Sequence, residues 1–178
     1  MCAMVSAVVL AAGASSRFGS PKQRLLLEPV LERVRRAHSI DEIVVVVGAH
    51  AVDTDARVVR CADWQRGPGA SLRCGLAALS PATKAAVVIL ADGPKLAPEA
   101  IDRVVAAWRE GTGDILAASY GGNRGHPVLL DREVWAQIPD EGARALEPIL
   151  VPSDDLGAPG DVDVPDDLRG RVGGAGEE

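Results

Sequence analysis

A Gly- and Ser-rich segment that carries two cations gives this chain its clearest chemical pattern. Residues 10–22 read L-A-A-G-A-S-S-R-F-G-S-P-K and follow the apolar run Val5–Leu10, which predicts a buried parallel strand. The two glycines let the backbone approach a ligand closely, and exposed loop N–H groups can donate to phosphate oxygens. Arg17 adds a planar guanidinium that can donate several hydrogen bonds. Lys22, one of only three lysines in the chain, adds a mobile point charge. The segment therefore predicts a cradle for a polyphosphate.

The spacing within this segment is neither the G-x-x-x-x-G-K-[ST] of a P-loop nor the G-x-G-x-x-G of a dinucleotide fold. It resembles the signature L-A-A-G-x-S-x-R-F/M-G-x-P-K of the molybdopterin cytidylyl- and guanylyltransferases. These enzymes attach a nucleotide to the molybdenum cofactor and are close in fold to sugar-nucleotide pyrophosphorylases. Ala11, Ala12 and the pair Ser15–Ser16 are more similar to the cytidylyl branch. The alternative is a plain Gly/Ser turn.

A second segment, residues 64–79, reads W-Q-R-G-P-G-A-S-L-R-C-G-L-A-A-L. It resembles W-x-x-G-x-x-x-S-L-R-x-G-L, which this family uses around the nucleotide base and ribose; taken alone, it is a capped helix start. The resemblance implies that Lys22 and Arg17 are catalytic. The expected nucleotide-binding residues are Leu10, Ala11, Ala12, Gly13, Ala14, Ser15, Ser16, Gly19, Gly69, Ser71 and Arg73.

Two aspartates are the expected metal ligands. Asp92 follows the apolar run 87–91, and a carboxylate at the end of a buried strand is a common place to hold Mg²⁺ together with substrate phosphates. The alternative is an Asp that starts a turn with Gly93. Asp163 lies in D-V-D-V-P-D-D-L, which resembles the family's D-[IV]-D-T-P-E-D-L; a solvated acidic loop is its alternative. The resemblance implies Mg²⁺ as the cofactor.

His126 lies in R-G-H-P, which is similar to the family's G-x-R-G-H-P. The resemblance implies that it contacts or orients the phosphate of the incoming pterin, whereas a histidine in a turn before proline is more often structural. A phosphomonoester is already ionised near pH 7, because its second pKa is about 6. The acceptor therefore needs no strong general base.

Strand-like and helix-like patterns alternate along the chain. Apolar runs at 5–10, 43–47, 58–59 and 85–91 predict strands, and helical patterns cover 22–37, 70–79 and 98–108. Residues 114–120 and 127–130 flank a glycine-rich turn, and two short helices are expected after Asp131 and Glu141. The pattern predicts an α/β fold, a three-layer α/β/α sandwich with a mostly parallel sheet, and the resemblance implies the nucleotide-diphospho-sugar transferase type.

In such sheets ligands bind at the carboxyl ends of the strands. This geometry places Gly13, Arg17 and Asp92 on one rim. Residues 1–169 are expected to form one nucleotidyltransferase domain, and the Gly-rich, acidic residues 170–178 a disordered tail.

Composition narrows the function classes. A net charge of −6 and 3% aromatic residues argue against nucleic-acid binding, and the apolar runs are far shorter than the ~20 residues that span a bilayer. No basic n-region precedes the first strand, so a cytoplasmic location is expected. Cys2, Cys61 and Cys74 are odd in number and show no C-x-x-C spacing, which favours reduced thiols over a disulfide or zinc site.

The resemblance spans Val5 to about Leu168, with one departure beside the cradle. The family's Gly-Gly turn after Pro21–Lys22 is absent here. Three functions compete: a molybdopterin nucleotidylyltransferase that prefers CTP; a transferase of the same fold for another phosphorylated acceptor, such as a sugar or polyol phosphate; and a non-catalytic nucleotide-binding protein that delivers cofactor. For the first, a molybdenum hydroxylase or its chaperone is the expected partner.

Overall fold

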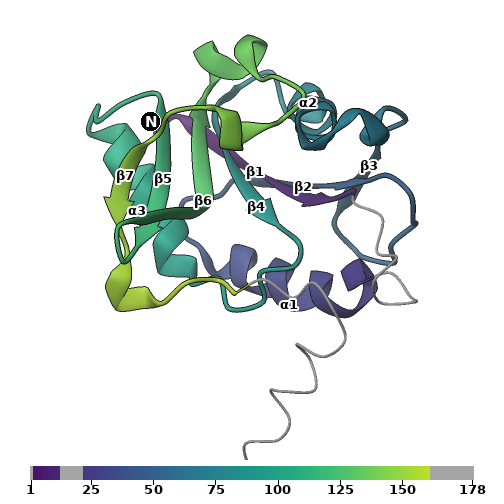
Figure 1. Ribbon diagram of the computed structural model, residues 1–178, viewed down its shortest axis with the longest axis horizontal. Helices are drawn as coiled ribbons and strands as arrows, with labels where there is room; N and C mark the ends of the chain where they lie inside the picture. The colour runs from purple at the N-terminus through teal and green to yellow at the C-terminus, as the bar shows by residue number, and fades with distance from the viewer. Residues whose placement is uncertain (1, 13–21, 161–178) are drawn as a thin grey trace, which may run out of the picture.

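The computed structural model describes residues 2–12 and 22–160 of the chain. Seven strands and three α-helices alternate along it, with short 3₁₀-helices between them (Figure 1). Their bounds are β1 (Met4–Ala11), α1 (Lys22–Arg36), β2 (Glu42–Val47), β3 (Arg57–Arg60), η2 (Trp64–Arg66), α2 (Pro68–Ala78), β4 (Thr83–Leu90), α3 (Pro98–Arg109), β5 (Ile115–Tyr120), β6 (Asn123–Asp131), η3 (Arg132–Gln137), η4 (Ala143–Ala145), β7 (Ile149–Pro152) and η5 (Asp154–Leu156).

The strands form one seven-stranded sheet in the order β3-β2-β1-β4-β6-β5-β7. Neighbouring strands are parallel except where β6 pairs with β4 and β5. The expected mostly parallel sheet is therefore confirmed. Leu10 of β1 pairs with Leu90 of β4, so these two central strands end at the same edge.

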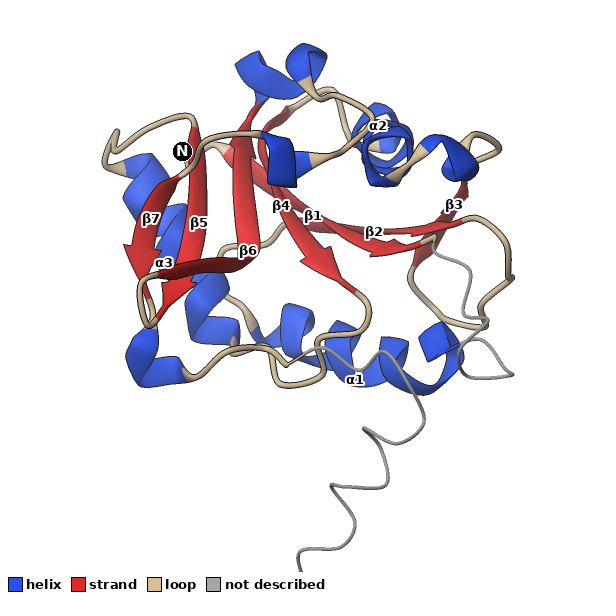
Figure 2. Ribbon diagram, viewed as in Figure 1, coloured by secondary structure: helices blue, strands red, loops and turns tan. Residues whose placement is uncertain are grey.

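Helices cover both faces of the sheet, which confirms the three-layer sandwich. Helices α1 and α3 lie on one face, and α2 with η3 lies on the other (Figure 2). Side chains of β1 alternate between the two cores, as the period of a strand requires. Val9 packs with Val30 and Ile101 on the α1/α3 side, and Val8 packs with Leu72 on the α2 side.

Helix α2 lies unusually close to the sheet. A Cβ atom on Gly75 would lie 2.6 Å from Cγ1 of Val8 and 2.7 Å from Cγ2 of Val46. Only a glycine allows this approach without displacing one of the valines. Pro68 begins the helix, where its missing N–H costs nothing. The position of α2 is thus fixed by packing along its length.

The structure corrects the expectation that all cysteines are reduced thiols. Cys61 and Cys74 form a disulfide with their Cα atoms 5.8 Å apart, a normal separation for such a bond. Cys61 follows β3 and Cys74 lies on α2, so the chain topology brings together two residues that show no pairing motif in the sequence. Cys2 is a free, exposed thiol.

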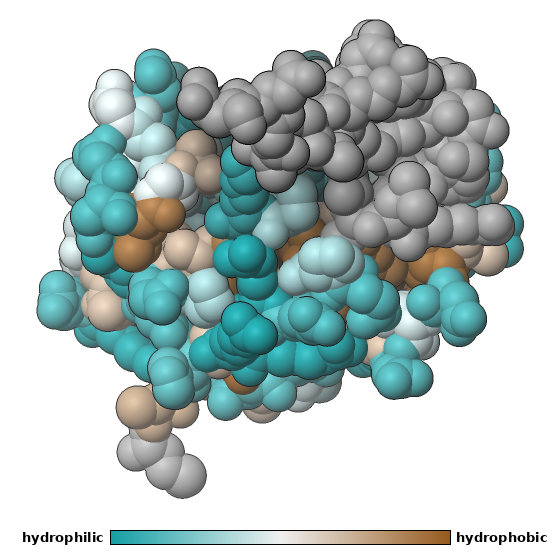
Figure 3. All heavy atoms as spheres, turned by 90° about the horizontal axis from the view of Figure 1, so that it is seen from below, coloured by the Kyte–Doolittle hydropathy of each residue, from teal (hydrophilic) through white to brown (hydrophobic). Residues whose placement is uncertain are grey.

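Two smaller expectations also changed. The short helices after Asp131 and Glu141 are 3₁₀-helices, and β7 was not expected. The expected tail at 170–178 lies outside the described residues. On the α1/α3 side, the surface outside the grey atoms is mainly hydrophilic, with apolar residues in small scattered areas (Figure 3). Within the described residues, no helix is long and apolar enough to cross a membrane.

Candidate functional site

The carboxyl ends of β1 and β4 lie side by side and bring two predicted site elements together. The backbone N–H of Ala91 donates to the carbonyl of Leu10 at 3.1 Å. The first residues of the signature therefore lie next to the turn that carries Asp92, as the strand pattern predicted. Ala11 and Ala12 are 5% and 6% exposed, so their methyl groups belong to the core. Only backbone groups of this pair can reach a ligand.

The rest of the signature lies outside the described residues. This applies to Gly13, Ala14, Ser15, Ser16, Arg17 and Gly19, and equally to the second expected metal ligand, Asp163. Lys22 begins α1, and its side chain is likewise not described. The roles assigned to these residues therefore stay predictions.

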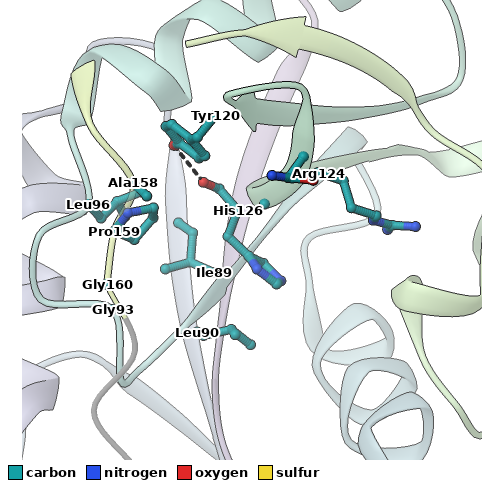
Figure 4. A pocket seen from close by; sticks show the side chains of 12 residues that line it. Ile89, Leu90, Gly93, Leu96, Tyr120, Arg124, His126, Ala158, Pro159 and Gly160 are labelled. Carbon is teal, nitrogen blue, oxygen red and sulfur yellow. Dashed lines mark hydrogen bonds between the residues drawn. The ribbon is translucent and has the colours of Figure 1, made fainter. Parts of the chain in front are cut away.

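A cavity of about 370 Å³ opens beside Asp92. Its walls come from the end of β4 and the following loop, from the β5–β6 hairpin, and from the segment 158–160 (Figure 4). The backbone N–H of Lys95 donates to the carbonyl of Pro159 at 2.8 Å and holds that segment in place. The lining residues are Ile89, Leu90, Gly93, Leu96, Tyr120, Asn123, Arg124, Gly125, His126, Ala158, Pro159 and Gly160.

His126 projects from the hairpin toward the end of β4, where Leu90 lies (Figure 4). Burial lowers the pKa of its imidazole to about 4, the Asp92 carboxylate opposes that shift, and Arg124 adds to it. The electrostatic effect of Asp92 on His126 places the two predicted site residues in one neighbourhood. At neutral pH the imidazole is uncharged, so it can donate one hydrogen bond and accept one. It is suited to orient a phosphate rather than to neutralise it.

The hairpin that carries His126 is held by two residues that the sequence analysis did not assign. The Tyr120 hydroxyl donates to the carbonyl of His126 at 2.8 Å, and burial raises the pKa of that hydroxyl. The Tyr120 ring lies against Gly125, where a Cβ atom would be 2.9 Å from it. Tyr120 is the only tyrosine of the chain and directly precedes the Gly-Gly turn, which was the available signal.

Arg124 fixes the other side of the hairpin. Its guanidinium donates to the carbonyls of Ala143, Arg144 and Leu146, at 3.0, 3.3 and 2.7 Å. In Figure 4 the side chain extends away from His126. Arg124 thus joins the hairpin to η4 and the residue that follows it.

The residues expected around the base and ribose lie at the start of α2, and there they contact protein. A Cβ atom on Gly69 would lie 1.7 Å from the carbonyl oxygen of Pro139, and the Gly69 N–H donates to the carbonyl of Asp140. Arg73 donates to the Ile138 carbonyl at 2.8 Å and to the Asp140 carboxylate, which lowers the pKa of that carboxyl. Gly69 and Arg73 join α2 to residues 138–140, and their nucleotide contacts stay predictions.

Ser71 is 3% exposed, and its contact with the nucleotide also stays a prediction. Trp64, on the loop before α2, is the aromatic residue of this region. A Cβ atom on Gly48 would lie 2.4 Å from Cγ of Trp64 and 2.7 Å from the carbonyl oxygen of Ala12. Gly48 follows β2, so Trp64 packs across the carboxyl ends of β2 and β1, beside the start of the signature.

Residues 7–150 match the MobA-like NTP transferase domain. The chain belongs to this family. Several solved structures resemble it over most of its length. Rv0371c from Mycobacterium tuberculosis H37Rv is 29% identical, with a TM-score of 0.77 over 96% of this chain and 99% of that one. A structure of Rv0371C in complex with manganese is 26% identical, with a TM-score of 0.71 over 97% and 100% of the two chains.

The bifunctional protein GlmU from Cutibacterium acnes (strain DSM 16379 / KPA171202) is 32% identical over 122 residues. That match covers 60% of this MobA-like chain but only 29% of GlmU. The family and its structural neighbours support nucleotidyltransferase chemistry for the protein, and the fold is that of the nucleotide-diphospho-sugar transferases.

Proposed function

We propose that the protein transfers a nucleotidyl group, preferably CMP from CTP, to the phosphate of molybdopterin and releases pyrophosphate. The observation that carries the proposal is the placement of the cavity. It lies between the loop of Asp92 and the hairpin of His126, beside the strand end from which the L-A-A-G-A-S-S-R-F-G-S-P-K signature leaves. A donor held by the signature would present its α-phosphorus toward an acceptor in this cavity.

In the proposed reaction an acceptor phosphate oxygen forms a bond to the α-phosphorus. The bond from that phosphorus to the oxygen bridging to the β-phosphorus breaks, and pyrophosphate leaves. Catalysis of such a transfer is mostly positioning and charge stabilisation. Lys22 and Arg17 would neutralise the charge of the reacting centre and the leaving group. The neutral imidazole of His126 would orient the acceptor phosphate, which is already ionised at neutral pH.

Asp92 can contribute one carboxylate to a divalent cation, but the described residues do not form a complete set of metal ligands around it. Among residues 2–12 and 22–160 there is no group of three or more His, Cys, Asp or Glu that could hold a metal. Mg²⁺ is usually bound by one or two carboxylates together with substrate phosphates, so a site completed by the triphosphate suits this arrangement. The manganese in the Rv0371C structure supports a divalent metal, which would neutralise phosphate charge. We propose Mg²⁺ on Asp92.

Asp163 is proposed as the second carboxylate. The described chain ends at Gly160, whose carbonyl oxygen would lie 3.7 Å from a Cβ atom on Gly93. Three residues of extended chain reach at most about 11 Å. A residue three positions after Gly160 is therefore within reach of the loop that carries Asp92.

The experiment is pyrophosphate release with Mg²⁺ and purified molybdopterin, comparing CTP with GTP, ATP and UTP. We expect release with CTP, and we expect Lys22→Ala to lower kcat more than it raises KM, because the contact strengthens in the transition state. The matched control is Lys84→Ala, since Lys84 is exposed near the amino end of β4. Weakened triphosphate binding with an unchanged kcat in Lys22→Ala would contradict the proposed role.

A second candidate is a transferase for another phosphorylated acceptor, such as a sugar or polyol phosphate. One observation favours keeping it: GlmU is a relative at 32% identity over 122 residues. Release with a sugar phosphate and none with molybdopterin would select it. Triphosphate binding without release for any acceptor would select a non-catalytic binding protein that delivers cofactor, to a molybdenum hydroxylase or its chaperone.

A further inference from the structure

We infer that the Cys61–Cys74 disulfide is a redox-dependent clamp on the nucleotide-binding side of the site. The inference rests on the proposed function, because it concerns how the same site binds its triphosphate. In the oxidised state the loop between the two cysteines is held in a binding-competent position, and reduction of the bond weakens binding of the triphosphate.

The first observation is what the disulfide encloses. Its two cysteines are 13 positions apart. Between them lie η2, which contains Trp64, and the Gly67–Ser71 stretch at the start of α2. The bond therefore closes a ring around the segment that is expected to surround the base and ribose.

The second observation is that the loop within this ring is anchored more weakly than the helix, although Cys61 itself is held by an N–H donated to the carbonyl of Val47 at 2.8 Å. Helix α2 is fixed on the sheet by close packing at Gly75 and by the bonds of Arg73 to residues 138–140. The segment 62–66 has weaker anchors: Ala62, Asp63, Gln65 and Arg66 are exposed, and half-buried Trp64 packs against the core. Its ion pair, from Arg66 to Asp140 at 3.4 Å, joins two largely exposed side chains and contributes little. A segment with few buried contacts opens at low free-energy cost, so loss of the disulfide releases the loop and not the helix.

The third observation connects this loop to the ligand. Trp64 packs against Gly48, and Gly48 also lies next to the carbonyl of Ala12, which directly precedes the glycine of the signature. The loop position therefore determines what lies beside Ala12, at the start of the signature, on the β2 side. If reduction leaves the loop correctly placed in about a tenth of the molecules, the apparent Kd rises about tenfold.

The exposure of the two sulfur atoms indicates how the bond would be reduced. Cys61 is 1% exposed, whereas Cys74 is half-buried. A low-molecular-weight thiolate would attack Sγ of Cys74, form a mixed disulfide there and release Cys61 as a thiolate. A second thiol then attacks the mixed disulfide, frees Cys74 and leaves as the oxidised dimer. Two external thiols are thus oxidised for each bond reduced, and oxidation by a disulfide such as that dimer reverses the step.

The test compares the full chain before and after reduction with a dithiol. Thiol counting on denatured protein should give one free thiol, from Cys2, in the oxidised state and three after reduction, since the chain has three cysteines. Calorimetric titration with CTP and Mg²⁺ should show a Kd about tenfold weaker after reduction, equivalent to about 1.4 kcal/mol. Hydrogen exchange of peptides covering 61–67 should become faster while that of α2 changes little.

Two variants complete the design. Cys74→Ser should bind CTP like the reduced protein and show no response to dithiol, and Cys2→Ser should respond like the wild type. Equal CTP affinity in both redox states, whether or not exchange of 61–67 changes, would overturn the clamp while leaving the proposed function intact. Failure to bind any of the four triphosphates in either state would instead refute the proposed function, and the clamp with it.

Discussion

The buried imidazole of His126 makes a quantitative prediction about stability and pH. Its pKa is lowered to about 4 from 6.5 by burial. Above pH 6.5 the residue is neutral in both the folded and the unfolded chain, so it adds no pH dependence. Between pH 6.5 and 4 the unfolded chain binds a proton that the folded protein does not, so stability falls as the pH falls. Below pH 4 both states are protonated and the effect levels off.

The size of the effect follows from the two pKa values. A full separation of 2.5 units corresponds to about 3 kcal/mol of unfolding free energy, and about 2 kcal/mol of it is lost between pH 7.5 and pH 5. Urea unfolding of the wild type and of His126→Gln at these two pH values measures it. The Gln variant keeps a neutral polar side chain and should lose about 2 kcal/mol less on acidification.

The difference in stability loss between the wild type and His126→Gln isolates the contribution of the His126 imidazole. Asp140 and Asp155 also have lowered pKa values, each held down first by a hydrogen bond from an arginine. Their contributions are present above the unfolded pKa and are lost as the pH falls through the folded pKa, below the window used here. They are common to both proteins and cancel. If wild type and His126→Gln lose the same stability between pH 7.5 and pH 5, the imidazole is not buried as described.

Three further predictions concern catalysis, packing and covalent tethering. Asp92→Asn should lower the rate of pyrophosphate release by about 100-fold or more, as loss of charge stabilisation at a reacting phosphate does, with little change in melting temperature. Asp114→Asn is the control, because Asp114 lies just before β5, at the amino ends of the parallel strands. Equal rates of release in the two variants would refute the metal role of Asp92. Gly75→Ala should destabilise the protein by about 1–3 kcal/mol in urea unfolding, because the new methyl group meets two valines of the sheet. Helix propensity alone predicts a gain in stability of about 1 kcal/mol. A stabilised variant would therefore refute the close packing of α2 on the sheet. Cys74→Ser should cost about 3 kcal/mol and lower the melting temperature by about 6–12 °C in calorimetry, and an unchanged melting temperature would show that the disulfide does not form.

The order of elements was predictable because the longer apolar runs of the chain are buried strands. Residues 85–91 are continuous in apolar residues and residues 5–10 are apolar apart from Ser6, as in strands covered on both faces. They became β4 and β1 with a shift of one or two residues at their ends. Strand β7 was missed because it is short and at the sheet edge, with Ile149 and Leu150 46% and 41% exposed. Strand prediction from apolar patterns depends on buried residues, and this short, exposed strand has few of them.

The candidate site was predictable where it depends on strand ends and not where it depends on tertiary contacts. Asp92 was found because it follows a buried strand. The bonds of Arg73 to residues 138–140 could not be predicted, since they join segments more than 60 positions apart. The disulfide was not predicted for a similar reason. Its two cysteines are brought together by the packing of α2 near the end of β3, and the spacing of the cysteines in the sequence does not indicate that packing.

The single antiparallel strand divides the sheet into two parts. On one side of the β4–β6 ladder, parallel strands lead to the signature and to Asp92; on the other, the β5–β6 hairpin and β7 carry the wall with Tyr120 and His126. Within the sheet, the pairs from Ala85 with Asp131 to Val88 with Val128 join them. Insertions or deletions at the tip of the hairpin would therefore reshape the wall that carries Tyr120 and His126 while leaving the register of β1 and β4 unchanged. Paralogues that share a donor can diverge in acceptor through a segment of about twenty residues, a short step for evolution and a defined target for engineering.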